Sequence, residues 1–525
     1  MNGLMILICI VIIIVYLINL LLKQKYNYWK KKNVPYVTPL PILGNYGGYI
    51  LQQEHAGQLL QKLCQQFPDS AYFGAFYGTE PVLVVQSPEL LKHILTKDFY
   101  LFHGREITKY EANEINTQNM FFASGDGWKV VRQNLTPMFS SAKMKNMFHL
   151  IEKCSHTFED MLDRELGTSE VFEAKYLTAR YTMDCVCACT FGVESKTMTN
   201  PENNPFGVMA STLFNCTNLA GFKMVCRSMW PAIFYGLGFK YYPETIYVFF
   251  TQLLKNVFES RNYRHSSKND FVDLLLNMKN EDVITCDSIK NFKTTLEEKV
   301  QLKVTDDILV AQCISFFAAG FETSATTTSL TLYELAINQE VQKRAAEEVD
   351  EYMRRHDNKL GYECINELPF LTACMYETIR KYPLLGHLTR EVMEDCALPD
   401  GLRLEKGLRI HIPVHSMHHN TDIFPEPEVY QPERFLPENM INVKPYTFLP
   451  FGEGPRNCIG KRFAKMQVLA GLVSILKKYQ VELAEGMPKK LRLEGRNLTT
   501  QPRDQGLFLK VSKRLGWEQK TFLRT

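Results

Sequence analysis

The sequence predicts a mainly helical fold with small β-sheets, preceded by a membrane-spanning helix. An apolar run opens the chain at Leu4–Leu22, a helical pattern without proline spans 305–336, and a second periodic helical segment spans 461–476. The β-branched runs are short by comparison, so we expect their strands to form small sheets; they cover 82–85, 408–414 and 507–511.

The composition is that of a globular protein. The 525 residues are 22% charged and 45% hydrophobic, with a formal net charge of +3, which gives no argument for nucleic-acid binding. Length alone would suggest two or more domains. The 14 cysteines are too scattered for a disulfide scaffold, and Cys185, Cys187 and Cys189 alternate on a predicted helix. We therefore interpret the thiols as mostly reduced core residues of a cytosol-facing protein.

The N-terminal segment predicts a signal anchor. At 1.5 Å per residue the run Leu4–Leu22 is roughly 28 Å long, about one hydrocarbon core. Lysines follow it, which places the C-terminal side in the cytosol. A cleavable signal peptide is the alternative, but the apolar run is too long and no charged region precedes it. We expect an anchor at 1–24, a basic and proline-rich linker at 25–45 and a globular domain at 46–525.

Trp128 and Arg132 lie four positions apart, so on a helix they share one face. An indole N–H beside a guanidinium suits a carboxylate ligand, and a Trp–Arg stacking contact on the surface is the alternative. Farther along, residues 206–243 form an apolar and aromatic stretch, which we expect either to contact a membrane or to pack in the core. The stretch 265–304 is polar and predicts surface helix and loop.

The long helical pattern begins with Thr305 as its cap, followed by two aspartates. Near its middle stand Gly320, Glu322 and Thr323, where glycine and threonine are poor helix formers. We expect Thr323 to bond back to the carbonyl of residue 319 and open the helix locally. A harmless irregularity is the alternative.

Two further groups of side chains follow. Glu377 and Arg380 lie three apart on the helical segment 368–382, a spacing that permits an ion pair, although surface pairs of this kind are common. The histidines at 411, 415, 418 and 419 could suggest zinc; we reject that interpretation because no ligand motif accompanies them, and expect them to line a surface turn.

The segment 451–460, FGEGPRNCIG, holds Cys458 in a loop with three glycines just before the predicted helix 461–476. The helix dipole and the neighbouring Arg456 favour a thiolate there. A thiolate with one open face is either a nucleophile or a metal ligand.

The spacing Phe451, Gly454, Arg456, Cys458, Gly460 resembles the haem-binding signature of the cytochrome P450 superfamily. Four other motifs precede this segment in the family's order: the Trp128–Arg132 pair, the Gly320–Thr323 segment, Glu377–Arg380 and the Pro-Glu-Arg-Phe segment at Arg434. The resemblance covers the chain after the anchor and implies one triangular helical domain around a buried haem. Within the superfamily, the sequence is most similar to the microsomal branch common in insects, which is active on xenobiotics and endogenous lipids.

The resemblance implies the following roles. Cys458 is the axial ligand of the haem iron, within a loop that includes Phe451 and Arg456. Trp128, Arg132 and Arg390 bind the haem propionates. Gly320 admits dioxygen, and Glu322 with Thr323 steers protons and water. Glu377, Arg380 and Arg434 form a buried ionic network that holds the Cys458 loop, and residues 206–243 form a mobile lid.

The implied function is a haem-thiolate monooxygenase of the endoplasmic reticulum membrane, acting on lipophilic small molecules. No flavin domain or dinucleotide fingerprint is apparent, so electrons should come from NADPH through a separate cytochrome P450 reductase, with cytochrome b5 as a second candidate donor. The basic residues Lys129, Lys461, Arg462 and Lys465 would attract that partner, or form an ordinary solvated face. The rivals are a haem-thiolate isomerase or dehydratase of peroxides, a non-catalytic haem carrier and a thiol hydrolase. We expect apolar cavity walls near Phe121, Phe316, Leu385, Leu388 and Gln501.

Overall fold

The computed structural model describes residues 2–106, 108–214, 217–266, 270–292, 297–503 and 506–519. Its α-helices are α1 Asn2–Tyr26, α2 Tyr28–Lys31, α3 Gly47–Ile50, α4 Ala56–Cys64, α5 Pro88–Lys92, α6 Gly125–Leu135, α7 Ser141–Leu166, α8 Ala174–Val186, α9 Pro205–Phe214, α10 Asn218–Met229, α11 Pro231–Gly236, α12 Glu244–Ser260, α13 Phe271–Glu281, α14 Asp306–Ile337, α15 Gln339–Arg355, α16 Cys364–Glu367, α17 Pro369–Lys381, α18 Val414–His418 and α19 Lys461–Leu476. The last of these has the bounds that the sequence predicts.

The strands are short and form small sheets, as predicted. They are β1 Tyr72–Tyr77, β2 Glu80–Val85, β3 Val171–Glu173, β4 Val283–Asp287, β5 Lys299–Lys303, β6 Leu388–Glu391, β7 Cys396–Ala397, β8 Arg403–Leu404, β9 Arg409–Ile412, β10 Tyr479–Leu483 and β11 Phe508–Lys513. The largest sheet has the order β1-β2-β9-β6, in which β9 runs parallel to β2 and pairs Arg409 with Val82. A second sheet has the order β10-β11-β3.

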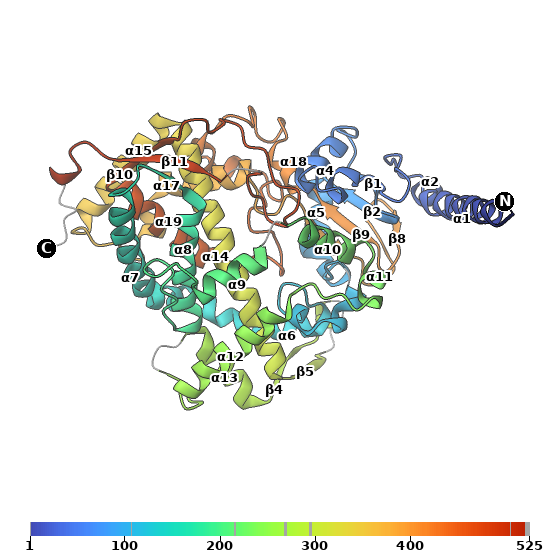
Figure 1. Ribbon diagram of the computed structural model, residues 1–525, viewed down its shortest axis with the longest axis horizontal. Coiled ribbons are helices and arrows are strands. Elements are labelled where there is room, and N and C mark those ends of the chain that lie inside the picture. The colour runs from blue at the N-terminus through green and yellow to red at the C-terminus, as the bar shows by residue number, and fades with distance from the viewer. Residues whose placement is uncertain are drawn as a thin grey trace.

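Helix α14 crosses the middle of the molecule, whose outline in Figure 1 tapers toward α13 and the β4–β5 hairpin. Thr305 caps it by accepting a hydrogen bond from the backbone N–H of Ile308 (3.3 Å). Helix α8 packs along it, and Thr182 Oγ1 donates to the carbonyl of Phe321 (3.0 Å). The main core surrounds these helices, and Cys185, Cys187 and Cys189 are buried in it, as predicted.

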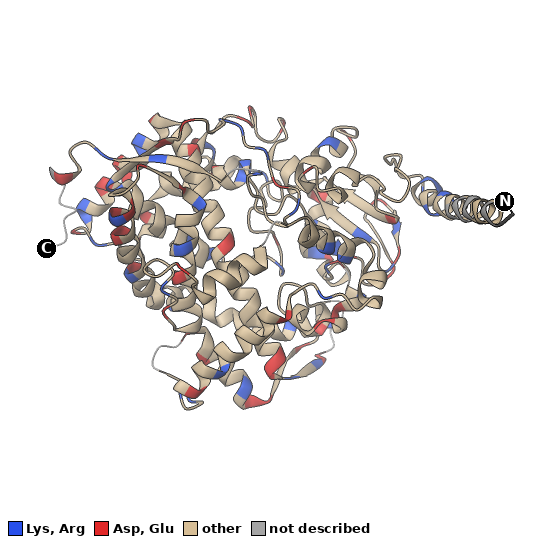
Figure 2. Ribbon diagram, viewed as in Figure 1, with Lys and Arg blue, Asp and Glu red and all other residues tan. Residues whose placement is uncertain are grey.

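Helix α1 projects from the body in Figure 1, and Figure 2 shows basic residues where it joins that body. In the part of the chain that the structure describes, α14 is the one helix long and apolar enough to cross a membrane. Most of α14 is buried inside the protein, so it is a core helix. Membrane crossing by α1 stays a prediction.

The described residues of 206–243 include most of α9 and all of α10 and α11, and they are partly buried and partly exposed. Val225, Met229 and Phe234 are buried, whereas Ile233 and Leu237 are 60% and 68% exposed. The segment is therefore part core and part apolar surface.

Two expectations about the surface were wrong. The histidines of β9 and α18 do not line a surface turn, because β9 is an inner strand of its sheet and His411, His415 and His418 are buried. The stretch 265–304 contains the hairpin β4–β5, which the sequence pattern did not indicate.

Candidate functional site

The candidate site is a cavity between the middle of α14 and the loop 449–460. Residues of α6, the start of α7 and the segment 383–390 complete its walls, and most of its lining is apolar. Four of the expected wall residues line it: Phe121, Phe316, Leu385 and Leu388. Gln501 and the late strand β11 are not part of this lining.

A second cavity, of about 510 Å³, lies between α7 and the loop 192–199. It shares Met147 and Cys189 with the first cavity. Its charged lining residues include acids and lysines from several elements, and none of the predicted site residues borders it. The first cavity is therefore the better candidate.

The loop that carries Cys458 depends on glycines in the left-handed backbone region. Gly452 has φ +69° and Gly454 has φ +75°, which other residues rarely adopt. A Cβ on Gly454 would lie 1.8 Å from the carbonyl oxygen of Leu95, so no side chain fits there. The backbone N–H of Cys458 donates to the carbonyl of Phe451 (2.8 Å), and both residues border the cavity.

Opposing effects act on the pKa of the Cys458 thiol. Burial raises its pKa, and this outweighs the backbone N–H of Gly460 and the charges of Arg132, Arg105 and Lys461, all of which favour the thiolate. The Arg456 guanidinium donates to the carbonyl of Ala123 and lies over the Trp128 ring (4.6 Å to the centroid). Coordination of a metal would favour the thiolate, because metal coordination deprotonates a thiol.

Four arginines line the same cavity: Arg105, Arg132, Arg390 and Arg456. Burial and the neighbouring arginines lower the pKa of Arg105 to about 9, and burial lowers that of Arg390 to about 10. Burial, Arg105 and Arg390 also hold the pKa of Arg456 well below its usual value.

These cations have carbonyl partners and no acidic ones. Arg132 donates to the carbonyl and the side-chain oxygen of Asn457 (both 2.9 Å), and Arg105 donates to the carbonyl of Phe121 (2.8 Å). None of the four forms an ion pair within the described residues, and Nε of Arg390 and of Arg456 has no hydrogen-bond partner. Because a buried group of like charges is costly, the cavity suits an anionic ligand.

Sequence reasoning missed Arg105. It lies in a loop without a recognisable pattern, and its place in the cavity depends on the loop's packing against β6, where the backbone N–H of Glu391 donates to the carbonyl of Gly104 (2.9 Å). The other three arginines and Trp128 are where the sequence predicted, in the cavity wall.

On the α14 wall, Ala319, Gly320 and Thr323 face the cavity. Thr323 Oγ1 donates to the carbonyl of Ala319 (2.7 Å), which confirms the predicted back-bond. The helix is nevertheless continuous from Asp306 to Ile337, so the bond does not interrupt it. Gly320 also allows α8 to approach, because a Cβ there would lie 2.8 Å from Val186 Cγ2.

Glu322 does not share that wall. It is buried, it is not among the cavity-lining residues, and its carboxylate accepts hydrogen bonds from Lys175 Nζ (2.7 Å) and Gln501 Nε2 (2.6 Å). These contacts join α14 to α8 and to the C-terminal segment. A direct part for Glu322 in cavity chemistry therefore stays a prediction.

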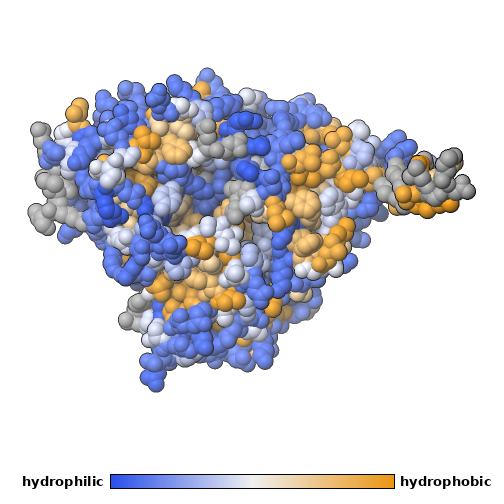
Figure 3. All heavy atoms as spheres, in the orientation of Figure 1, coloured by the Kyte–Doolittle hydropathy of each residue, from blue (hydrophilic) through white to orange (hydrophobic). Residues whose placement is uncertain are grey.

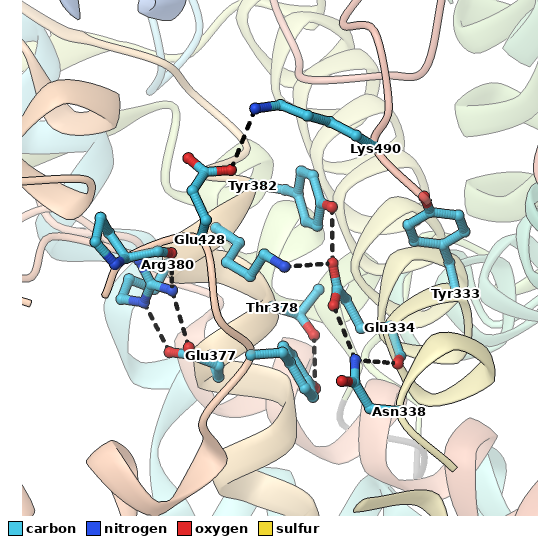
Figure 4. Close-up of polar contacts among 12 residues, drawn as sticks. Tyr333, Glu334, Asn338, Glu377, Thr378, Arg380, Tyr382, Glu428 and Lys490 are labelled. Atoms are coloured by element: carbon cyan, nitrogen blue, oxygen red, sulfur yellow. Dashed lines mark hydrogen bonds and ion pairs between the residues drawn. The ribbon is translucent and has the colours of Figure 1, made fainter. Parts of the chain in front are cut away.

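Glu377 and Arg380 form a fully buried ion pair on α17 with two hydrogen bonds of 2.7 and 2.9 Å (Figure 4). Arg434 lies near it, with its Nε 3.6 Å from Glu377 Oε1. The three residues come together as predicted. Arg434 also donates to the carbonyls of Pro425 and Glu426, so it ties down the segment before it in the chain.

A cysteine facing an apolar cavity, four arginines that form no ion pair among the described residues and a hydroxyl-bearing helix opposite form a distinctive combination. The family model for cytochrome P450 matches residues 34–508. The chain belongs to the cytochrome P450 family. It is similar to cytochrome P450 6k1 of Blattella germanica (34% identical, covering 90% of each chain). It is also similar to cytochrome P450 6B7 of Helicoverpa armigera (31%, covering 91% of this chain and 93% of the relative) and to a probable cytochrome P450 6a14 of Drosophila melanogaster (32%, covering 93% and 96%).

The P450 is accordingly a monooxygenase whose cofactor is a thiolate-ligated haem. The residues present fit that group. Cys458 borders the cavity and can ligate a metal there, and the arginines, which form no ion pair among the described residues, can receive the two propionates that haem carries.

Proposed function

We propose that this P450 inserts one oxygen atom of O2 into a lipophilic small molecule, a xenobiotic or an endogenous lipid, using electrons from NADPH through a separate reductase. The observation that carries the proposal is a single apolar cavity with Cys458 on one wall and Thr323 on the other. Aromatic and aliphatic side chains, including Phe121, Phe316 and Leu385, leave little for a polar substrate to bind.

The haem, when bound, supplies the oxygen chemistry, because electron donation by its thiolate ligand favours O–O cleavage. Cys458 would hold the iron. Arg132, Arg390, Arg456 and Trp128, together with Arg105, would hold the propionates, and the added anions would relieve the repulsion among the arginines.

The protein's own part on the opposite wall is proton handling. Thr323 Oγ1 faces the cavity, and its hydroxyl can give a proton and take one back from water. Gly320 keeps the neighbouring surface free of a side chain, leaving room for a small molecule. Apolar walls exclude bulk water, so that protons reach the site at few places.

We propose that the P450 is a single-pass protein of the endoplasmic reticulum membrane, anchored by residues 1–24 with its catalytic domain in the cytosol. Exposed apolar side chains on α10 and α11 and just after them would add a second membrane contact: Leu219, Phe222, Ile233, Leu237 and Phe239. Figure 3 shows apolar surface in this area, on the side from which α1 projects.

Liposome flotation of a chain without residues 1–24 tests the second contact. Changing Ile233 and Leu237 to Ser should weaken flotation, whereas Phe234 is 2% exposed and is no probe of the surface. If the chain without residues 1–24 does not float with liposomes even with Ile233 and Leu237 intact, the second membrane contact is contradicted.

We propose that the reductase docks on the face where α19 begins. Lys461 and Arg462 are exposed there, three and four residues beyond Cys458, and Lys465 is half-buried one turn later. A basic face beside the ligand suits an acidic electron donor such as NADPH-cytochrome P450 reductase, and cytochrome b5 could use the same face.

Reduced, carbon-monoxide-bound absorbance spectra test the function most simply. Cys458→Ala should abolish the thiolate-type band, and Cys313→Ala, a buried cysteine of α14 outside the cavity lining, should leave it intact. Addition of NADPH and reductase should then give oxygenated products from a panel of lipophilic compounds. A normal thiolate-type band in Cys458→Ala, or product formation without NADPH and reductase, would contradict the proposal.

A further inference from the structure

His418 connects the buried Glu377–Arg380 pair to the loop that carries Cys458. It ends α18 and has no exposed surface. Its Nε2 accepts a hydrogen bond from the backbone N–H of Leu449 (3.0 Å), and its carbonyl accepts one from Arg380 Nη1 (2.8 Å). Arg380 in turn is fixed by its two bonds to Glu377, seen in Figure 4.

Leu449 is where the cysteine loop begins to line the cavity. Its carbonyl accepts from the N–H of Gly452 (3.2 Å), and the carbonyl of Phe451 accepts from the N–H of Cys458 (2.8 Å). A route of hydrogen bonds thus runs from Arg380 on α17 through His418 to Leu449, and the backbone of the loop continues it to Cys458. Arg434 offers no such route, because its contacts are with Glu377 and the carbonyls of Pro425 and Glu426.

The protonation state of His418 follows from this geometry. A backbone N–H can only donate, so Nε2 must be an acceptor and the imidazole must be neutral, with its proton on Nδ1. Burial holds the pKa of His418 well below its usual value, and the charges of His419 and Arg380 act in the same direction. The Phe448 ring (centroids 5.1 Å apart) and the Phe424 ring (6.4 Å) pack against the imidazole.

We propose that His418 is a positioning residue for the thiolate ligand: its neutral imidazole holds the N–H of Leu449 and so fixes how Cys458 faces the haem iron. The proposal rests on the proposed ligation by Cys458. It explains how a fully buried ion pair on α17, which does not touch the loop, can act on the loop.

Three variants separate positioning from general packing. His418→Leu removes the acceptor, and His418→Gln places an amide oxygen at a similar reach. His415→Leu is the matched control, because His415 lies one turn earlier on α18, is also buried, and makes no side-chain hydrogen bond to the loop. The measurement is the rate at which the haem-loaded, reduced protein loses its thiolate-type carbon-monoxide band in mild urea, beside the urea midpoint of global unfolding.

We expect His418→Leu to lose the band about tenfold faster than the unchanged protein, the scale of leaving one buried donor unpaired. His418→Gln should stay within about twofold, and His415→Leu should lose the band no faster than its lower unfolding midpoint requires. Equal rates in the two leucine variants, or no rescue by glutamine, would overturn the proposal.

If His418→Leu does not fold, His418→Asn replaces it, because that shorter amide cannot reach Leu449. Asparagine behaving like glutamine would then overturn the proposal, and faster band loss in asparagine would support it. Absence of the thiolate-type band from the unchanged protein would be a failure of Cys458 ligation, and therefore of the proposed function itself.

Discussion

The two walls of the cavity are built in different ways. The Cys458 wall is an irregular loop with two glycines at positive φ, and one of them, Gly454, leaves no room for a side chain. The opposite wall is one face of the continuous helix α14, with Thr323 toward the cavity and Glu322 turned away into an ion pair with Lys175. The first wall carries the proposed haem ligand, and the second presents hydroxyl groups, that of Thr323 among them. Changes on the loop side should therefore damage haem ligation, and changes on the helix side should damage chemistry alone.

The largest effect is expected from the ion pair behind the loop. Arg380→Leu leaves Glu377 buried without a partner, which costs about 3–5 kcal/mol of the free energy of unfolding. Glu351 and Arg354 have the same three-residue spacing but are exposed, so Arg354→Leu should cost under about 1 kcal/mol. Urea titration of both variants checks this, and similar losses in the two would contradict the contrast between buried and exposed pairs.

Glycine substitutions in the loop should have the next largest effect. Gly452 and Gly454 both have positive φ, so alanine is strained at either by about 1–2 kcal/mol. A Cβ at Gly452 meets nothing nearer than 3.8 Å, whereas one at Gly454 would collide with the Leu95 carbonyl. Haem retention and the thiolate-type spectrum should therefore be lost in Gly454→Ala and survive in Gly452→Ala. Equal haem retention in the two alanine variants would show that backbone strain, and not the collision with Leu95, determines the loss.

Acid should lower the free energy of unfolding of the whole protein. Burial lowers the pKa of His55 to about 4 and, in the segment 383–390, that of His387 to about 3. The unfolded chain takes up protons near pH 6.5, so between about pH 6.5 and pH 4 it binds more protons than the folded state. Stability should therefore fall as the pH drops through that range and be insensitive to these groups above it.

The check is the melting temperature of His55→Gln against pH. Its slope below pH 6.5 should be shallower than that of the unchanged protein, while His265→Gln, at an exposed position, should leave the slope unaltered. Parallel curves for all three proteins would contradict a role for the buried histidine.

A small effect is expected from Glu322. Because its carboxylate faces Lys175 and Gln501, Glu322→Gln should lower the product formed per NADPH by less than about tenfold. Loss of the ion pair should also reduce stability slightly, since Lys175 can still reach water. A much larger loss of product would mean that Glu322 takes a direct part in proton delivery, as the sequence resemblance implies.

Local signals explain what the sequence could predict. The Thr305 cap, the Thr323 back-bond, the helix Lys461–Leu476 and the glycine loop depend on neighbours within a few residues, and all are found. The position of Arg105, the burial of Phe234, the direction of Glu322 and the bond from Leu449 to His418 depend on elements far apart in the chain.

The most direct test of the division between the walls is one preparation of Thr323→Ala, reconstituted in membranes with reductase. Product formed per NADPH consumed should fall about 10²-fold, the usual scale for removing a proton-transfer group, while peroxide rises. The fold and the thiolate-type carbon-monoxide band should persist, because alanine suits a helix and the Cys458 wall is untouched. Unchanged product yield would remove Thr323 from the mechanism, and loss of the band would show that the two walls are not independent.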